Sequence, residues 1–104
     1  MDTDKLIAHS RSRFDHAAAK RTLKEKYQGK LVFAHNGGMF KAEPNLIVFL
    51  ESCWGQGQID PVIIDLYGNP VKVHSTNLLN EARKIYKEQT TAWLKEYEDL
   101  NKNR

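Results

Sequence analysis

The fold is decided by the stretch between residues 30 and 50, which reads KLVFAHNGGMFKAEPNLIVFL. At its centre Asn36-Gly37 is a strong signal for a tight hairpin, because both residue types tolerate positive φ. Apolar and β-branched residues lie on both sides of this turn. We therefore predict two antiparallel strands, one over residues 30–35 and one over residues 39–42.

The run that follows, Leu46–Leu50, is continuously apolar and rich in β-branched and aromatic residues. These properties predict a strand buried on both faces, and Pro44 is expected to end the strand before it. After a loop over residues 52–61, two more strands are predicted at 62–67 and 71–74, joined by a turn at Gly68-Asn69-Pro70. About five short strands within residues 30–75 are enough for a small barrel.

Helical periodicity flanks this region on both sides. Ser12 and Asp15 resemble a capping box, and Gly29 is a natural stop, so a helix is predicted over about residues 12–28. A second, long helix is predicted over about residues 77–101, capped by Ser75 or Thr76. The expected fold is mainly β with flanking helices.

The long second helix should overhang a small barrel, and an apolar stripe runs along its far end. Such stripes usually mark an interface. We predict an oligomer interface at Trp93, Tyr97 and Leu100. The alternative is that the helix folds back over its own domain and buries the stripe there.

With 104 residues and no repeat or linker, the chain is expected to form one domain over residues 1–104. Its first residues are acidic and its longest apolar run is short, so neither a targeting peptide nor a membrane span is predicted. The single cysteine, Cys53, fits a reducing compartment and is expected to be a small buried side chain. A cytoplasmic protein is expected.

Charge is distributed unevenly along the chain. Residues 1–30 carry eight Lys or Arg against four Asp or Glu, residues 31–70 carry one against four, and residues 71–104 carry seven against five. A polyanion would therefore be contacted mainly by the first thirty residues. The alternative is that these charges only solvate a helix face.

No pattern points to catalysis, a metal or a cofactor. The histidines lack the spacing of a metal site, and no phosphate loop, dinucleotide motif or nucleophile elbow is present. One acid/base pair is conceivable, Asp65 with His35 or His74, but we interpret Asp65 as an outward-facing strand residue. We therefore expect a protein that is not an enzyme.

The order of a helix followed by five short strands resembles the Sm-like (Lsm/Hfq-type) family. The family's first motif is similar to residues 31–51, where Asn45 leads into an apolar strand that ends in acid. Its second motif is similar to residues 66–71, which contain Tyr67-Gly68-Asn69. The whole chain looks like a divergent Sm-like protein of cyanophage origin, which would act in the cytoplasm of an infected host.

This resemblance implies a five-strand SH3-like barrel, a cyclic homo-oligomer and single-stranded RNA as a partner. At such a site Tyr67 would stack on a base from the other side of the pocket, the amides of two asparagines would read base edges, and a lysine and a histidine would contact phosphate. The alternative is that Asn45, Gly68 and Asn69 are only the residues that turns require. The implied RNA-binding residues are Asn45, Tyr67, Gly68, Asn69, Lys72 and His35.

Two positions depart from the family pattern. Glu43 stands where the family has a stacking aromatic residue, and Tyr67 stands where it has an arginine. Because stacking and cationic side chains supply most single-strand affinity, both changes weaken an RNA site. The alternative function is a protein-only assembly or adaptor module that has lost RNA binding.

Overall fold

The computed structural model describes the backbone of residues 3–102 and the side chains of residues 15–102. Three helices alternate with two β-hairpins, and the helices contain 28, 12 and 28 residues. The predicted mainly-β barrel over residues 30–75 is wrong. The strands form two separate two-stranded sheets, and no barrel closes within residues 3–102.

The first hairpin forms at Asn36-Gly37, as the sequence predicted. Strand β1 (Val32–His35) pairs antiparallel with β2 (Gly38–Lys41). Asn36 and Gly37 take φ values of 49° and 82°, the left-handed region that these residue types tolerate.

The predicted strand Leu46–Leu50 is wrong, because these residues lie inside helix α2 (Pro44–Gly55). Pro44 occupies the first turn of the helix, where its missing N–H costs nothing, and extended Glu43 precedes it. The apolar sequence also continues with helical spacing to Cys53. Leu50 and Cys53 are buried, so tertiary packing selects the helix over the intrinsic β preference of the run.

The second hairpin joins β3 (Val62–Ile64) to β4 (Pro70–Lys72). Its turn begins at Asp65, earlier than predicted, because the Asp65 carboxylate organises the turn. Oδ1 accepts hydrogen bonds from the backbone N–H groups of Tyr67 (3.0 Å) and Asn69 (2.8 Å), and Oδ2 accepts one from Met39 on the first hairpin (3.1 Å). Asp65 is thus a buried link between the two hairpins, not an outward-facing residue.

The hairpins also pack closely side by side. A Cβ atom on Gly38 would lie 2.7 Å from Val71 Cγ2, so this position requires glycine. Below the hairpins, apolar side chains from both sheets meet those of α2 and of α3 (Ser75–Lys102). This core contains Phe40, Leu50, Ile63, Val73, Leu78 and Leu79.

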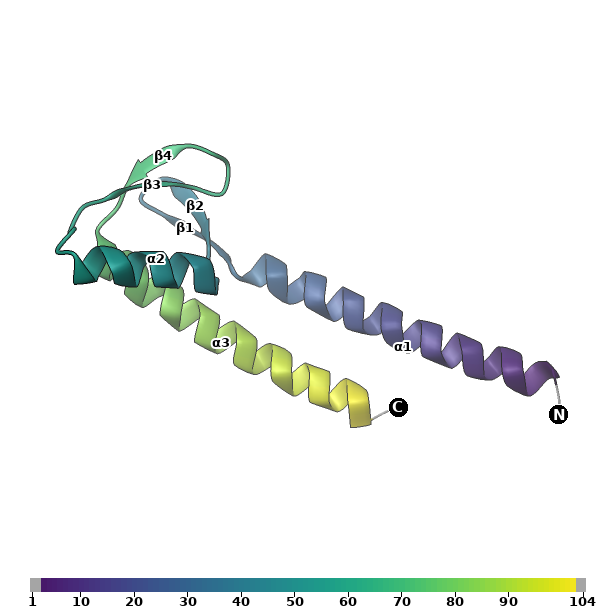
Figure 1. Cartoon of the computed structure of the whole chain (residues 1–104). Coiled ribbons are helices and arrows are strands. Elements are labelled where there is room, and N and C mark those ends of the chain that lie inside the picture. Colours follow the sequence, from purple (N-terminus) through teal and green to yellow (C-terminus); the bar gives the residue numbers. More distant parts are fainter. Residues whose placement is uncertain (1–2, 103–104) are drawn as a thin grey trace.

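The long helices extend away from this core in the same direction (Figure 1). Helix α1 (Thr3–Lys30) begins earlier than the predicted residue 12, and α3 begins at Ser75. His74 caps α3, because its Nδ1 accepts a hydrogen bond from the Asn77 N–H (3.3 Å). We call residues 31–86 the head, and α1 together with residues 87–102 the arm.

The molecule is markedly elongated. Its radius of gyration is 19.5 Å and its extents are 67 × 24 × 19 Å, whereas a compact chain of this length would have a radius of gyration of about 13 Å. The arm is held by a few contacts between α1 and α3. The Tyr27 and Trp93 rings stack at 6.1 Å, Lys26 pairs with Glu96 at 3.0 Å, and the Lys20 ammonium lies over the Tyr97 ring.

Candidate protein-contact site

Helix α2 is apolar around its whole circumference although it lies on the surface of the head. Glu51 is its only charged residue. One side faces the core through Leu50 and Cys53, but Val48 is 62% exposed, Phe49 49% and Trp54 66%. A helix of this composition is normally covered on all sides. In this chain a large part of it faces solvent.

The outward face of α2 is formed by Asn45, Val48, Phe49 and Ser52, which are all exposed. Their spacing of three and four residues places them on one side of the helix. None of the four side chains is ionisable. The face is therefore an uncharged patch with two apolar residues at its centre and one polar residue toward each end.

Two hollows separate this face from strand β3. The larger, of about 420 Å³, lies beside Phe49 and Val62, and the smaller, of about 200 Å³, lies beside Leu46 and Ile64. Val62 and Ile64 alternate with buried Ile63, so both point outward, and they are 63% and 62% exposed. The apolar surface of α2 thus continues onto β3.

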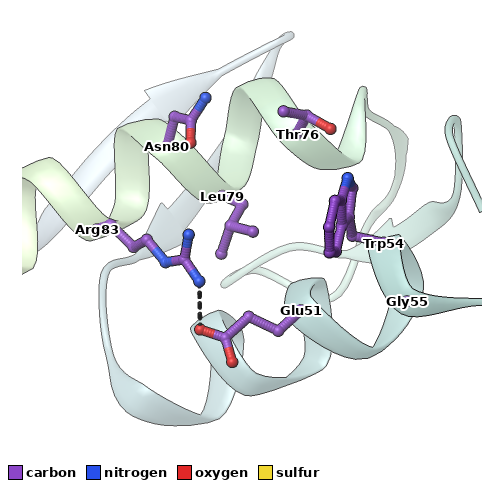
Figure 2. A pocket seen from close by; sticks show the side chains of 7 residues that line it. All are labelled: Glu51, Trp54, Gly55, Thr76, Leu79, Asn80 and Arg83. Atoms are coloured by element: carbon purple, nitrogen blue, oxygen red, sulfur yellow. Dashed lines mark hydrogen bonds and ion pairs between the residues drawn. The ribbon is translucent and has the colours of Figure 1, made fainter.

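On its other side, α2 borders a third pocket of about 460 Å³ against α3 (Figure 2). The Trp54 ring stands at one end, Leu79 forms the floor, and an ion pair between Glu51 Oε1 and Arg83 Nη2 (2.6 Å) closes the other end. The loop predicted from residue 52 is wrong at Trp54, which lies in the last turn of α2 and had no predicted role. A clue was available, because Cys53 and Trp54 continue the helical spacing of Leu46, Ile47 and Leu50.

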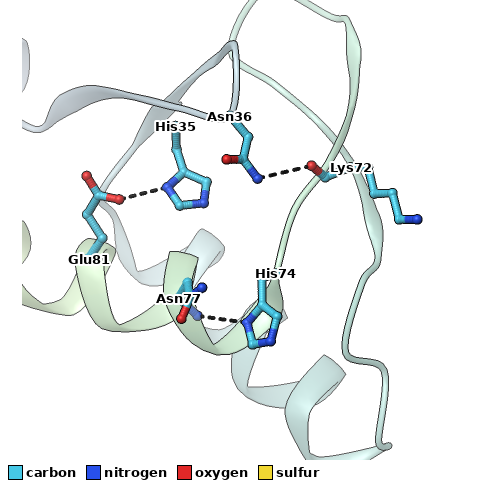
Figure 3. A network of polar contacts seen from close by, with 6 residues as sticks. All are labelled: His35, Asn36, Lys72, His74, Asn77 and Glu81. Atoms are coloured by element: carbon cyan, nitrogen blue, oxygen red, sulfur yellow. Dashed lines mark hydrogen bonds and ion pairs between the residues drawn. The ribbon is translucent and has the colours of Figure 1, made fainter.

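The six residues implied for RNA binding lie in three places. Tyr67, Gly68 and Asn69 form the β3–β4 turn, where Tyr67 is 70% exposed. The Lys72 backbone lies beside the first hairpin, since Asn36 Nδ2 donates to its carbonyl (3.4 Å), but the Lys72 side chain points away from His35 (Figure 3). Asn45 lies in the first turn of α2, and among the described side chains no hydrogen bond joins it to the other five.

His35 is engaged within the head. Its Nδ1 lies 2.7 Å from Glu81 Oε2 on α3, its side chain is only 14% exposed, and its Nε2 is buried without a hydrogen-bond partner (Figure 3). A histidine held in this way is poorly placed to contact a phosphate.

The conceivable acid/base pair does not form, because the Asp65 oxygens are bound by backbone amides rather than by His35 or His74. These hydrogen bonds, led by that of Asn69, hold the pKa of Asp65 below its ordinary value. Among the described residues, no group of three potential metal-ligating side chains is present. No helix in residues 3–102 is long and apolar enough to span a membrane.

The predicted interface residues lie on the side of α3 that faces α1. Trp93 is stacked on buried Tyr27, Leu100 is half-buried, and Tyr97 remains 38% exposed. Part of this stripe is therefore covered within the chain, by α1 and not by a barrel. Among the side chains of residues 15–102, more of the exposed large apolar residues lie on the head than on the arm.

Comparisons with protein-family models, with curated proteins and with solved structures found no match to this chain.

Proposed function

We propose that this chain is a non-catalytic, self-assembling protein module in which the face of α2 contacts another copy. The observation that supports it is the exposure of Val48 and Phe49 on a helix with a single charged residue. Exposed apolar surface of this extent typically marks a protein interface.

RNA binding is the second candidate and has less support. Tyr67 is exposed and could stack on a base, but His35 is held by Glu81 and Asn45 belongs to the uncharged face of α2. The region that carries these residues is acidic, with one Lys against four Asp or Glu over residues 31–70. Such a surface disfavours a polyanion.

The test is the absolute mass of the full chain by light scattering, from micromolar to near-millimolar concentration, with and without a uridine-rich or an adenine-rich oligonucleotide. We expect a multiple of 12.0 kDa that the oligonucleotides do not change. A monomer at every concentration would refute self-assembly, and a mass that rises only with oligonucleotide would favour RNA binding.

The contact surface is tested by Val48→Asp, which places a charge at the centre of the face. We expect this variant to be monomeric, because burying an unpaired carboxylate is costly. Leu94→Asp is the matched control, since Leu94 is similarly exposed (56%) but lies on the arm. Equal loss of assembly in both variants would argue against α2 as the contact surface.

A further inference from the structure

We infer that two copies pack their α2 helices antiparallel about a two-fold axis, with Asn45 of each copy against Ser52 of the other. This geometry rests on the proposed self-assembly and specifies its interface. The residue pattern of the uncharged α2 face matches itself under such a rotation.

The match comes from the order of residues along α2. Val48 and Phe49 lie at the middle of the face, and Asn45 and Ser52 lie equally far from that midpoint on either side. An antiparallel two-fold pairing therefore places Val48 against Phe49 of the second copy, twice. It also places each Asn45 amide near a Ser52 hydroxyl, so the polar residues are hydrogen-bonded when they leave water.

The charges around the face are compatible with this pairing. Glu51 is already paired with Arg83 (2.6 Å), and Glu43 with Lys41 (3.8 Å), within the same chain. Asp60 lines the hollow beside Phe49, is exposed, and stays at the rim in contact with water. Two copies can thus meet along α2 without burying an unpaired charge.

The direction of pairing also follows from helix electrostatics. Antiparallel helices place the positive end of each backbone dipole beside the negative end of the other. A parallel pairing would instead place Asn45 against Asn45 and Phe49 against Phe49, with like ends of the helices together. Val62 and Ile64 on β3 flank α2 and add apolar area to a contact that a helix of 12 residues alone would leave small.

The experiment is disulfide trapping with the double variant Asn45→Cys/Ser52→Cys. The two positions lie about 10 Å apart along the helix axis at ~1.5 Å per residue, whereas a disulfide needs Cα atoms about 4.4–6.8 Å apart. A bond between these cysteines must therefore join two copies. Native Cys53 is buried and is present in every variant.

Under mild oxidation we expect the double variant to become a covalent dimer on a non-reducing gel, at least tenfold faster than either single variant. Rapid cross-linking of the single variants Asn45→Cys and Ser52→Cys would instead show parallel pairing and overturn the inference. If the double variant does not cross-link, while the parent assembles and Val48→Asp is monomeric, this geometry is refuted but self-assembly is not. A monomeric parent would refute both.

Discussion

The head and the arm are stabilised in different ways although they share helix α3. In the head, side chains from both hairpins, α2 and α3 form a continuous buried core. In the arm, Tyr27 is the one buried residue among the described side chains. Helices that bury so little apolar surface are marginal in water, so the free energy of unfolding should reside mainly in the head, and the arm should open locally.

The largest effect should come from removing a core side chain from the head. Leu50 is fully buried, so Leu50→Ala should lower the free energy of unfolding by about 2–5 kcal/mol. Leu94→Ala makes the same chemical change at an exposed position of the arm and should alter it by less than about 0.5 kcal/mol. Urea denaturation measures both. Equal losses would contradict the contrast between head and arm.

A smaller loss of stability is expected from Asp65→Asn, which removes the charged acceptor that joins the two hairpins. Because its native pKa is depressed, the Asp65 carboxylate stabilises the native state above its ordinary pKa of about 4. This contribution is lost as the pH falls through the lower native pKa. The parent should therefore lose stability in acid more steeply than Asp65→Asn. Parallel melting-temperature profiles against pH would show that this link contributes nothing.

In the arm, Trp93→Ala removes the ring that stacks on Tyr27 and should cost on the order of 1 kcal/mol. Because the contact lies outside the core, amide exchange should accelerate in the arm and remain unchanged in the head. In Trp93→Phe, which keeps an aromatic ring, the arm amides should exchange almost as slowly as in the parent. Equal acceleration throughout the chain would mean that head and arm unfold as one cooperative unit.

The smallest effect is expected at the ion pair between Lys26 and Glu96, where the two side chains are 45% and 42% exposed to solvent. The hydrogen bond from Lys26 lowers the pKa of Glu96, so the ionised pair supports the arm above the ordinary pKa of glutamate and is lost in acid. Glu96→Gln should accelerate exchange in the arm less than Trp93→Ala does. The difference should shrink as salt is added. An effect independent of salt would indicate that packing, not charge, holds this site.

Local sequence signals predicted some elements of the head well and others poorly. Asn36-Gly37 marked the first hairpin because its backbone preference is strong and local. Leu46–Leu50 was predicted as a strand because its residues favour β structure, whereas Pro44 at a helix start and the apolar spacing through Trp54 pointed to a helix. The expectation that this run is buried on both faces is also wrong, because Val48 and Phe49 are exposed, and this uncovered side of α2 is the candidate site.

Other features of the site depend on contacts between distant segments. Asp65 shows a local clue, because an aspartate before a Gly-Asn turn often binds turn amides. Its bond to Met39 joins residues from different hairpins, and no local pattern predicts it. The pairings of Trp93 with Tyr27 and of Arg83 with Glu51 likewise depend on how α3 lies against α1 and α2.

The elongated shape has a hydrodynamic consequence. A radius of gyration of 19.5 Å is that of a compact chain of about 300 residues. A single copy should therefore diffuse more slowly than a sphere of its mass and elute from a gel-filtration column ahead of a globular protein of 12.0 kDa. Calibration against globular standards would thus overstate the mass of a monomer, whereas the ratio of sedimentation to diffusion coefficients gives the number of chains directly.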